Sequence, residues 1–139
     1  MVGFIHNIKS GQFDLPPISM TLGCSILRVS EDNSELECGY DIGGQFLNPA
    51  CQVQGGVLGA MLDDVMSLLL VNAVEKGHGI ATLSFNMSFI RPGLAGTFQA
   101  LSKLVRQGKE ICHVTGELRQ NGNLITTAAS VSKILSVAV

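Results

Sequence analysis

Residues 54–64 read QGGVLGAMLDD and open the stretch that decides the fold. From the glycine pair onward, leucine, valine, methionine and alanine continue for about twenty residues without a proline, which predicts one long helix. This helix is apolar on nearly every side, so we expect the rest of the small protein to wrap around it. Two adjacent aspartates, Asp63 and Asp64, interrupt it. A carboxylate in an apolar helix needs a hydrogen-bonding partner, an opposite charge or water, which makes both aspartates candidates for chemistry.

The segments on both sides of the helix alternate between apolar and polar residues as β-strands do. The strand-like segments are 20–29 and 35–42 before the helix, and 82–89, 97–106, 111–118 and 124–135 after it. Lys76-Gly77 is the expected end of the helix, and Asn121-Gly122 is typical of a type I′ hairpin, which needs positive φ at both central residues. We therefore predict an α+β protein in which a curved antiparallel sheet of about six strands wraps around one long central helix.

Length and composition predict one globular domain. Residues 1–19 show no clear period and contain Pro16-Pro17, so we expect an N-terminal arm followed by a domain over residues 20–139. Apolar residues make up 46% of the chain, charged residues 14%, and the net charge is -2, which argues against nucleic acid and for self-association. The four cysteines are widely spaced, which predicts neither a metal site nor a disulfide framework. With no export signal or membrane span expected, a cytoplasmic location is predicted.

Three features spaced along residues 48–63 resemble the signature of the PaaI-like acyl-CoA thioesterases, which have the hotdog fold. They are Asn48, then Gln54-Gly55-Gly56, then Asp63. That family usually has a histidine before the glycine pair and an aspartate or glutamate at the position of Asp63. The stretch TLSFNMSFIRPGLAGTFQALSKLVRQGK, residues 82–109, is also similar to the family's sequence after the helix.

The resemblance implies a role for each matching position. Asp63 matches the catalytic carboxylate, and Gly55 matches the residue whose backbone N–H polarises the thioester carbonyl. Asn48 matches a polar residue near the reacting water, and Thr82 matches a hydroxyl residue on the strand after the helix. Gln54 replaces the usual histidine. It keeps a hydrogen-bonding side chain but cannot take up a proton or a positive charge near neutral pH.

The same residues support thioester hydrolysis on chemical grounds. The first turn of a helix has unbonded N–H groups, and Gly55 and Gly56 would let them approach an oxygen that becomes negative during acyl transfer. A carboxylate could take a proton from water or attack the carbonyl itself. At 1.5 Å per residue, however, Asp63 lies roughly 12 Å along the helix from Gly55. An antiparallel partner helix would bring the two together, which predicts a homodimer, alone or paired as a dimer of dimers (a homotetramer).

Several of these interpretations have plainer alternatives. The candidates for contacts with the acyl-CoA substrate are Gly56, Arg91, Arg106 and Lys109. Basic side chains can bind the phosphates of CoA, but most such charges are only solvated surface. A carboxylate at position 63 could be a buried structural group, and Asp64 is its nearest rival for the catalytic role, because the helical period alone does not separate adjacent residues.

The leading hypothesis is an acyl-CoA thioesterase that releases a carboxylic acid and free CoA, with no metal and no organic cofactor beyond the CoA of its substrate. The alternative is a non-catalytic acyl-CoA-binding hotdog protein, which the glutamine at position 54 suggests. A hotdog hydratase or dehydratase is the third hypothesis, and it is disfavoured because none of the histidines lies near the start of the helix. Neither nucleic acid nor a membrane is expected as a partner.

Overall fold

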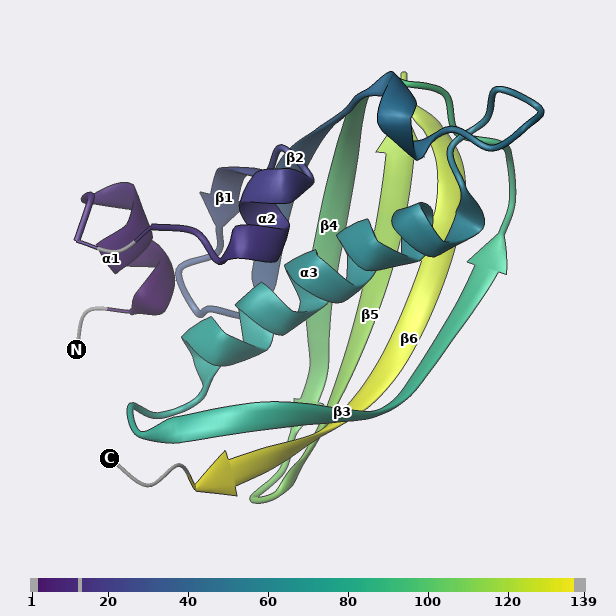
Figure 1. Ribbon diagram of the computed structural model, residues 1–139. Helices are drawn as coiled ribbons and strands as arrows, with labels where there is room; N and C mark the ends of the chain where they lie inside the picture. The colour runs from purple at the N-terminus through teal and green to yellow at the C-terminus, as the bar shows by residue number, and fades with distance from the viewer. Residues whose placement is uncertain (1–2, 13, 137–139) are drawn as a thin grey trace.

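The computed structural model describes residues 3–12 and 14–136. Figure 1 shows a curved antiparallel sheet with one long helix, α3 (Gly55–Ala73), across its concave face. The strands are β1 (Ser25–Val29), β2 (Glu35–Ile42), β3 (His78–Phe89), β4 (Gly96–Gln107), β5 (Ile111–Gln120) and β6 (Asn123–Ser136). Their order in the sheet is β1-β2-β4-β5-β6-β3. This six-stranded sheet around one helix confirms the predicted α+β architecture of the hotdog fold.

The central helix is buried because the sheet curves around it. Met61, Leu62, Val65 and Leu69 are 0% exposed and form the middle of the hydrophobic core. By length and composition alone, α3 could cross a membrane, but 61% of its apolar window is buried inside the protein. Removing these side chains from water stabilises the fold by about 1.5–3 kcal/mol each. The burial identifies α3 as the core helix of the domain.

The β1–β2 and β5–β6 hairpins confirm the strand patterns predicted from the sequence. In β2, the buried residues are Leu36, Cys38, Tyr40 and Ile42, and they alternate with half-buried or exposed positions. At the β5–β6 turn, Asn121 has φ 51° and Gly122 has φ 80°. Positive φ at both residues is the geometry of the predicted type I′ turn.

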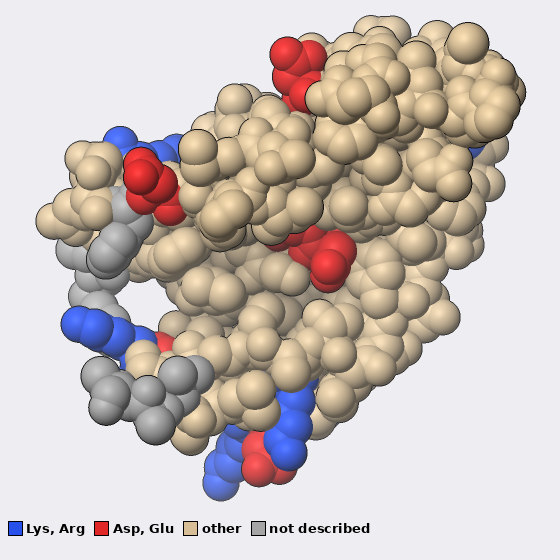
Figure 2. Space-filling view, viewed as in Figure 1, with Lys and Arg blue, Asp and Glu red and all other residues tan. Residues whose placement is uncertain are grey.

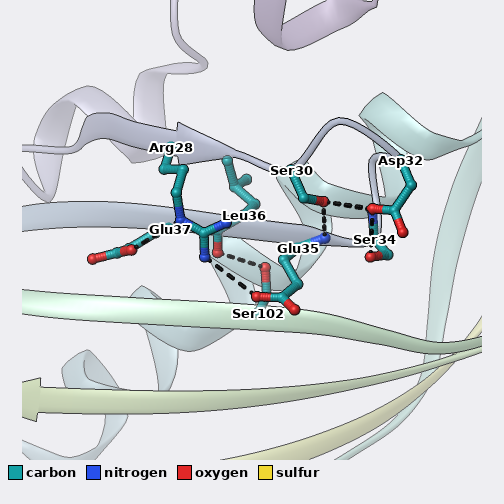
Figure 3. Close-up of polar contacts among 8 residues, drawn as sticks. All are labelled: Arg28, Ser30, Asp32, Ser34, Glu35, Leu36, Glu37 and Ser102. Carbon is teal, nitrogen blue, oxygen red and sulfur yellow. Dashed lines mark hydrogen bonds and ion pairs between the residues drawn. The ribbon is translucent and has the colours of Figure 1, made fainter.

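Figure 3 shows the polar contacts that hold the β1–β2 hairpin. In the turn, the Asp32 carboxylate accepts hydrogen bonds from the backbone N–H (3.1 Å) and the hydroxyl (2.7 Å) of Ser34. On the outer face of the sheet, the Arg28 guanidinium lies 3.3 Å from Glu35 and 3.5 Å from Glu37. Because these ion pairs are largely exposed, we expect each to contribute less than about 1 kcal/mol. The turn and the alternation are therefore the main determinants of this hairpin.

Two contacts show how closely the sheet approaches α3. The buried hydroxyl of Ser102 in β4 lies 3.2 Å from the carbonyl oxygen of Val65 in the helix. In β5, a Cβ atom at Gly116 would lie 2.8 Å from Met66 Sδ and 3.0 Å from Leu62 Cδ2. The absence of a side chain at Gly116 therefore lets α3 lie directly on β5.

Two short helices precede β1: α1 (Phe4–Lys9) and α2 (Pro17–Thr21). The prediction of a strand that begins at Met20 is wrong at its start, because Met20 belongs to α2 and β1 begins only at Ser25. Pro17 occupies the first position of α2, where its missing N–H costs no hydrogen bond and its fixed φ suits a helix.

The far end of α3 also differs from the prediction. The helix ends at Ala73, before the expected Lys76-Gly77 pair. At the opposite, N-terminal end, a 3₁₀ turn, η1 (Gly44–Phe46), occupies part of the loop that leads into the helix. The C-terminal end is followed by a turn. Gly77 has φ 89° and lies in the turn into β3. Helix α1 covers this end of α3, where the N–H of Ile5 donates a hydrogen bond to Asn72 Oδ1 (3.0 Å).

We expect Gly116→Val to lower the free energy of unfolding by about 1–3 kcal/mol, because the new side chain overlaps Met66 and Leu62 and pushes α3 away from the sheet. Thr115→Val is the matched control. Thr115 is the preceding residue, is exposed on the outer face, and should change the free energy of unfolding by less than about 0.5 kcal/mol. Urea unfolding followed by circular dichroism measures both variants, and equal stability of Gly116→Val and the wild type would contradict the close packing.

Candidate active site

The first turn of α3 has unbonded backbone N–H groups. The N–H groups of Val57 and Leu58 both donate to the carbonyl of Gln54, at 2.8 and 3.2 Å. Within the described ranges 3–12 and 14–136, neither the N–H of Gly55 nor that of Gly56 has a hydrogen-bond acceptor. Unbonded N–H groups at a helix N-terminus carry the positive end of the helix dipole, so this turn can bind an oxygen with negative charge.

The two glycines differ in their surroundings. A Cβ atom at Gly55 would lie 3.2 Å from Phe89 Cζ, so this residue packs directly against β3. Gly56 is exposed, and a Cβ atom there would have no neighbour within 4 Å. Gln54 precedes them as the N-cap residue, and its exposed side chain makes no capping hydrogen bond. The glutamine amide can therefore reach a molecule bound at this turn.

Asn48 holds the loop before α3 in shape. Its side-chain oxygen accepts hydrogen bonds from the N–H groups of Ala50 (2.9 Å) and Gln52 (3.1 Å). An asparagine that bonds to its own backbone in this way stabilises a tight turn. The structure thus shows Asn48 as a loop residue that bonds to its own backbone, and its role near the reacting water stays a prediction.

Asp63 and Asp64 lie in different environments. Asp63 is exposed, with the hydroxyl of Ser67 at 3.5 Å from its carboxylate. Asp64 is only 7% exposed, and its two oxygens accept hydrogen bonds from Ser19 Oγ (2.6 Å) and from the Tyr40 hydroxyl (2.8 Å). Figure 2 shows acidic atoms near the middle of an otherwise largely uncharged face over α3. Asp63 is therefore available to solvent and ligands, whereas Asp64 is engaged inside the protein.

Asp64 belongs to a buried polar cluster that joins α2, β2 and α3. Burial raises the pKa of Asp64, and the hydrogen bonds from Ser19 and Tyr40 partly oppose this effect. The thiols of Cys24 and Cys38 contact each other. This contact lowers the pKa of Cys24 and raises the pKa of Cys38. Neither Ser19 nor Tyr40 was predicted from the sequence as a site residue. A tyrosine on the inward face of β2 was a usable signal, because a buried hydroxyl needs a hydrogen-bonding partner.

Thr82 lies on β3, where it is exposed beside a bulge between Thr82 and Ser84. Strand β3 runs along α3 in the opposite direction. Two contacts show this direction: Phe89 lies against Gly55, and Met87 lies against Gly59. Because Thr82 comes earlier in β3 than these contacts, it lies beside later turns of α3, on the Asp63 side of Gly59.

The three basic candidates lie at opposite ends of the sheet. Arg91 follows β3 at the Gly55 end, and its guanidinium donates a hydrogen bond to the carbonyl of Leu124 (2.9 Å). At the other end, Arg106 is the next-to-last residue of β4 and Lys109 lies in the turn after this strand, where Figure 2 shows basic and acidic atoms together. One chain therefore brings Gln54, Gly55, Gly56 and Arg91 to one end, but it does not bring Asp63, Arg106 or Lys109 to them.

A hollow in the surface lies away from the first turn of α3. It has a volume of about 740 Å³, lies at the C-terminal end of the helix, and is lined by residues that include Asn7, Asn33, Asn72 and His78. A smaller hollow beside it, of about 240 Å³, is bordered by Lys109. Neither is lined by the other predicted site residues. At the first turn of α3, Gln54 and Gly56 are exposed to solvent.

The wrapped helix and the unbonded N–H groups at its start define a hotdog protein that can bind an oxyanion. Residues 47–133 match the family described as the acyl-CoA thioesterase N-terminal domain. A solved structure from Ralstonia eutropha JMP134, described as a phenylacetic acid degradation-related protein, is 40% identical, covers 94% of this chain and 98% of its own, and superposes with a TM-score of 0.90. The chain belongs to the acyl-CoA thioesterase family, and it is a thioester hydrolase.

More distant structures share the fold. A thioesterase from Haemophilus influenzae is 18% identical, covers 100% of this chain and 98% of its own, and has a TM-score of 0.84. The PaaI protein of E. coli, from the phenylacetic acid degradation operon, is 19% identical, covers 94% of both chains, and has a TM-score of 0.80. A comparison with proteins of curated function finds no match. The predicted family resemblance and hotdog fold are thus confirmed.

We expect the raised pKa of Asp64 to make stability depend on pH. An acid whose pKa is higher in the folded state binds more protons there, so its contribution is most favourable below the ordinary carboxyl pKa of about 3.9 and is lost as pH rises through the raised pKa. Asp64→Asn does not titrate, so this loss should be absent from its profile of Tm against pH.

Asp41→Asn is the control, because Asp41 is an exposed carboxylate in β2. It should retain the loss seen in the wild type. Parallel profiles of Tm against pH for the wild type and Asp64→Asn would contradict the assignment of this pH dependence to Asp64.

Proposed function

We propose that this enzyme hydrolyses an acyl-CoA thioester at a site shared by two subunits. In each site, Asp63 of one chain acts with the N–H groups of Gly55 and Gly56 of the partner chain. One observation carries this proposal. Helix α3 has unbonded N–H groups at its start and an exposed carboxylate roughly 12 Å further along its axis. Within one chain the two groups are too far apart to meet one thioester.

One face of α3 suits a second helix. Gly56, Ala60, Asp63 and Ser67 recur at helical spacing, and each is exposed or half-buried. These side chains are small or short, so another helix can approach closely. A copy of α3 that runs antiparallel about a two-fold axis near Gly59 would set Asp63 of each chain beside Gly55 of the other, which produces two equivalent sites.

The open edge of β3 supports the same assembly. Strand β3 lies at the end of the sheet, and residues 79–89 contain no proline and no charged residue. Leu83 and Phe89 in this strand are 60% and 54% exposed, and Ile90, directly after it, is 49% exposed. Unpaired edge strands in monomeric proteins are usually protected by charge, proline or a covering segment. An uncharged edge of this length with exposed apolar side chains therefore favours pairing with a second copy of the chain.

The chemistry follows from these positions. The thioester carbonyl oxygen accepts hydrogen bonds from the N–H groups of Gly55 and Gly56, which stabilise the negative charge that develops there. Asp63 either takes a proton from water as the water attacks the carbonyl carbon, or attacks that carbon itself to form an acyl intermediate that water then hydrolyses. On both routes the C–S bond breaks and CoA leaves as a thiolate that takes up a proton. Gln54 offers a further neutral N–H donor.

The proposed dimer would also bring basic residues of both subunits toward each site. In the antiparallel arrangement, the Gly55 end of one chain, with Arg91, lies alongside the Asp63 side of the other chain, whose far end carries Arg106 and Lys109. We propose that these side chains bind the phosphates of CoA. Hydrolysis by N–H groups and a carboxylate requires no metal or organic cofactor, and the four cysteines are free thiols, which suits a reducing cytoplasm.

We expect Asp63→Asn to lower turnover of acyl-CoA by a hundredfold or more and to leave folding and acyl-CoA binding largely intact, because it removes the proton acceptor without changing the shape of the side chain. Ser67→Ala, one turn further along the same face, is the control and should stay within about threefold of the wild type. Released thiol measures turnover. If Asp64→Asn is inactive while Asp63→Asn is active, the catalytic aspartate is Asp64. Binding without thiol release by the wild type would favour the non-catalytic alternative.

Mixing two inactive variants tests the shared site. Gly55→Pro removes one N–H at the first position of a helix, where proline is favoured, and its Cβ atom requires Phe89 to move by a few tenths of an ångström. Gln54, with φ −56° and ψ 136°, already has a backbone compatible with a following proline. Asp63→Asn and Gly55→Pro should each be nearly inactive alone. After subunit exchange, their equal mixture should regain about a quarter of wild-type turnover, because half of the dimers are mixed and each mixed dimer has one intact site.

Light scattering and differently tagged subunits check that mixed dimers form. Mixed dimers that stay inactive would place the whole site within one chain, and an active monomer would exclude the shared site altogether.

Gln54→His restores the residue that is usual in the family. We expect its turnover to rise or to stay within roughly tenfold of the wild type, about 1.4 kcal/mol in barrier, because both side chains offer an N–H donor. The pH–rate profile of the wild type should show an acid limb from the carboxylate and no inflection from position 54, whereas the histidine adds one near pH 6.5. A Gln54→His protein that binds acyl-CoA normally but loses most of its turnover would show that glutamine has a specific role.

A further inference from the structure

Gln120 is the last residue of β5, and it breaks the apolar pattern of the inward-facing side chains of that strand. Cys112, Val114 and Leu118 precede it on the same face and are buried. Gln120 is itself only 8% exposed. Burying a side-chain amide costs free energy unless both of its polar atoms are hydrogen-bonded. A glutamine at this position therefore points to a specific partner.

That partner is the backbone of the loop between β3 and β4. Gln120 Oε1 accepts a hydrogen bond from the N–H of Leu94 (2.9 Å), and Gln120 Nε2 donates one to the carbonyl of the same residue (2.7 Å). The Leu94 side chain is exposed, so the amide holds the backbone and not the side chain. The start of the loop is held separately, because the N–H groups of Ile90 and Arg91 donate to the carbonyl of Ile125, at 2.8 and 3.2 Å.

The residue before Leu94, Gly93, connects this loop to α3. The carbonyl of Gly93 accepts a hydrogen bond from the N–H of Val53 (2.8 Å). A Cβ atom at Gly93 would lie 2.9 Å from Phe98 Cζ and 3.1 Å from Leu58 Cδ2. The loop backbone is therefore packed against the first turn of the helix with no room for a side chain.

Val53 directly precedes the residues that form the first turn of α3. Its N–H is held by Gly93, and the N–H of Gln54 is held by the carbonyl of Phe46 (3.0 Å). These two hydrogen bonds set the path of the chain into Gly55. A continuous series of contacts thus runs from Gln120 through the loop to the unbonded N–H groups.

We propose that Gln120 is a positioning residue for the N–H groups of Gly55 and Gly56, and that it acts through Leu94, Gly93 and Val53. This role rests on the proposed function of that turn in binding the thioester oxygen. Gln120 contacts no substrate atom in this scheme. A displacement of about 1 Å at a catalytic group can cost on the order of a hundredfold in rate. Hydrogen bonds that fix the loop at two points are therefore sufficient to affect turnover.

Gln120→Met tests the role, because it keeps the length of the side chain and removes both hydrogen bonds. We expect kcat to fall about 10- to 100-fold with KM within about twofold, and the exchange rate of the Val53 amide hydrogen to rise at least about tenfold. Gln99→Met is the matched control. Gln99 is an exposed glutamine in β4, and its replacement should change neither quantity.

Gln120→Glu adds a readout that a purely structural role would not produce. A protonated carboxyl group can donate to the carbonyl of Leu94 and accept from its N–H, so it replaces both hydrogen bonds. The ionised form has no proton to donate and repels that carbonyl. The ratio of the kcat of Gln120→Glu to that of the wild type should therefore fall as pH rises, whereas the ratio for Gln120→Met should stay constant.

The outcomes separate this proposal from the proposed function. The exchange rate of the Val53 amide hydrogen is measured without substrate, so it reports on the loop alone. A fully active Gly55→Pro would contradict the function proposed for the N–H groups, but it would leave this measurement valid. If kcat is unchanged in Gln120→Met, the positioning role is overturned, whether or not exchange is faster. The positioning role is also overturned if Gln120→Met lowers Tm but changes neither kcat nor the exchange rate.

Discussion

The structure depends on one constraint: a helix of 19 residues that is apolar almost all round and that a single sheet cannot fully cover. The sheet buries the side that carries Met61, Leu62 and Val65. The remaining side carries glycine, alanine and serine residues with one aspartate among them, and it lies next to a strand edge without charges. The groups suited to thioester chemistry occur on this uncovered side. In the proposed dimer, a second copy of the chain would cover this side of the helix and complete the site at the same time.

Most of the fold could be predicted from the sequence because its determinants are local. Alternation over residues 35–42 identifies β2, and Asn121-Gly122 identifies a hairpin turn, whatever the rest of the chain does. Helix α2 could not be predicted in this way. It has only five residues, and the hydroxyl of Ser19 holds it on Asp64, a contact between residues distant in sequence. The strand expected from Met20 was wrong for that reason.

The candidate site was predictable only in part. The glycine pair and its helix could be recognised from composition, but the helical period does not distinguish adjacent aspartates. A rotation of about 100° per residue separates them in the structure, and it turns Asp64 toward Tyr40 while Asp63 stays exposed. Gln120 was missed because its partner, the backbone of Leu94, is 26 positions away in sequence. A polar residue among inward-facing apolar ones was the only local sign.

The contact between β3 and the start of α3 has a thermodynamic consequence. Phe89 and Met87 of this edge strand lie directly against Gly55 and Gly59, so any chain that pairs with β3 would also brace the first turn of α3. In the proposed dimer, association and ligand binding are therefore linked. Reciprocity requires that an acyl-CoA bound across the two subunits strengthens their association by the same factor by which association strengthens its binding. On dilution below the dissociation constant of the dimer, the substrate itself would then promote assembly of the enzyme.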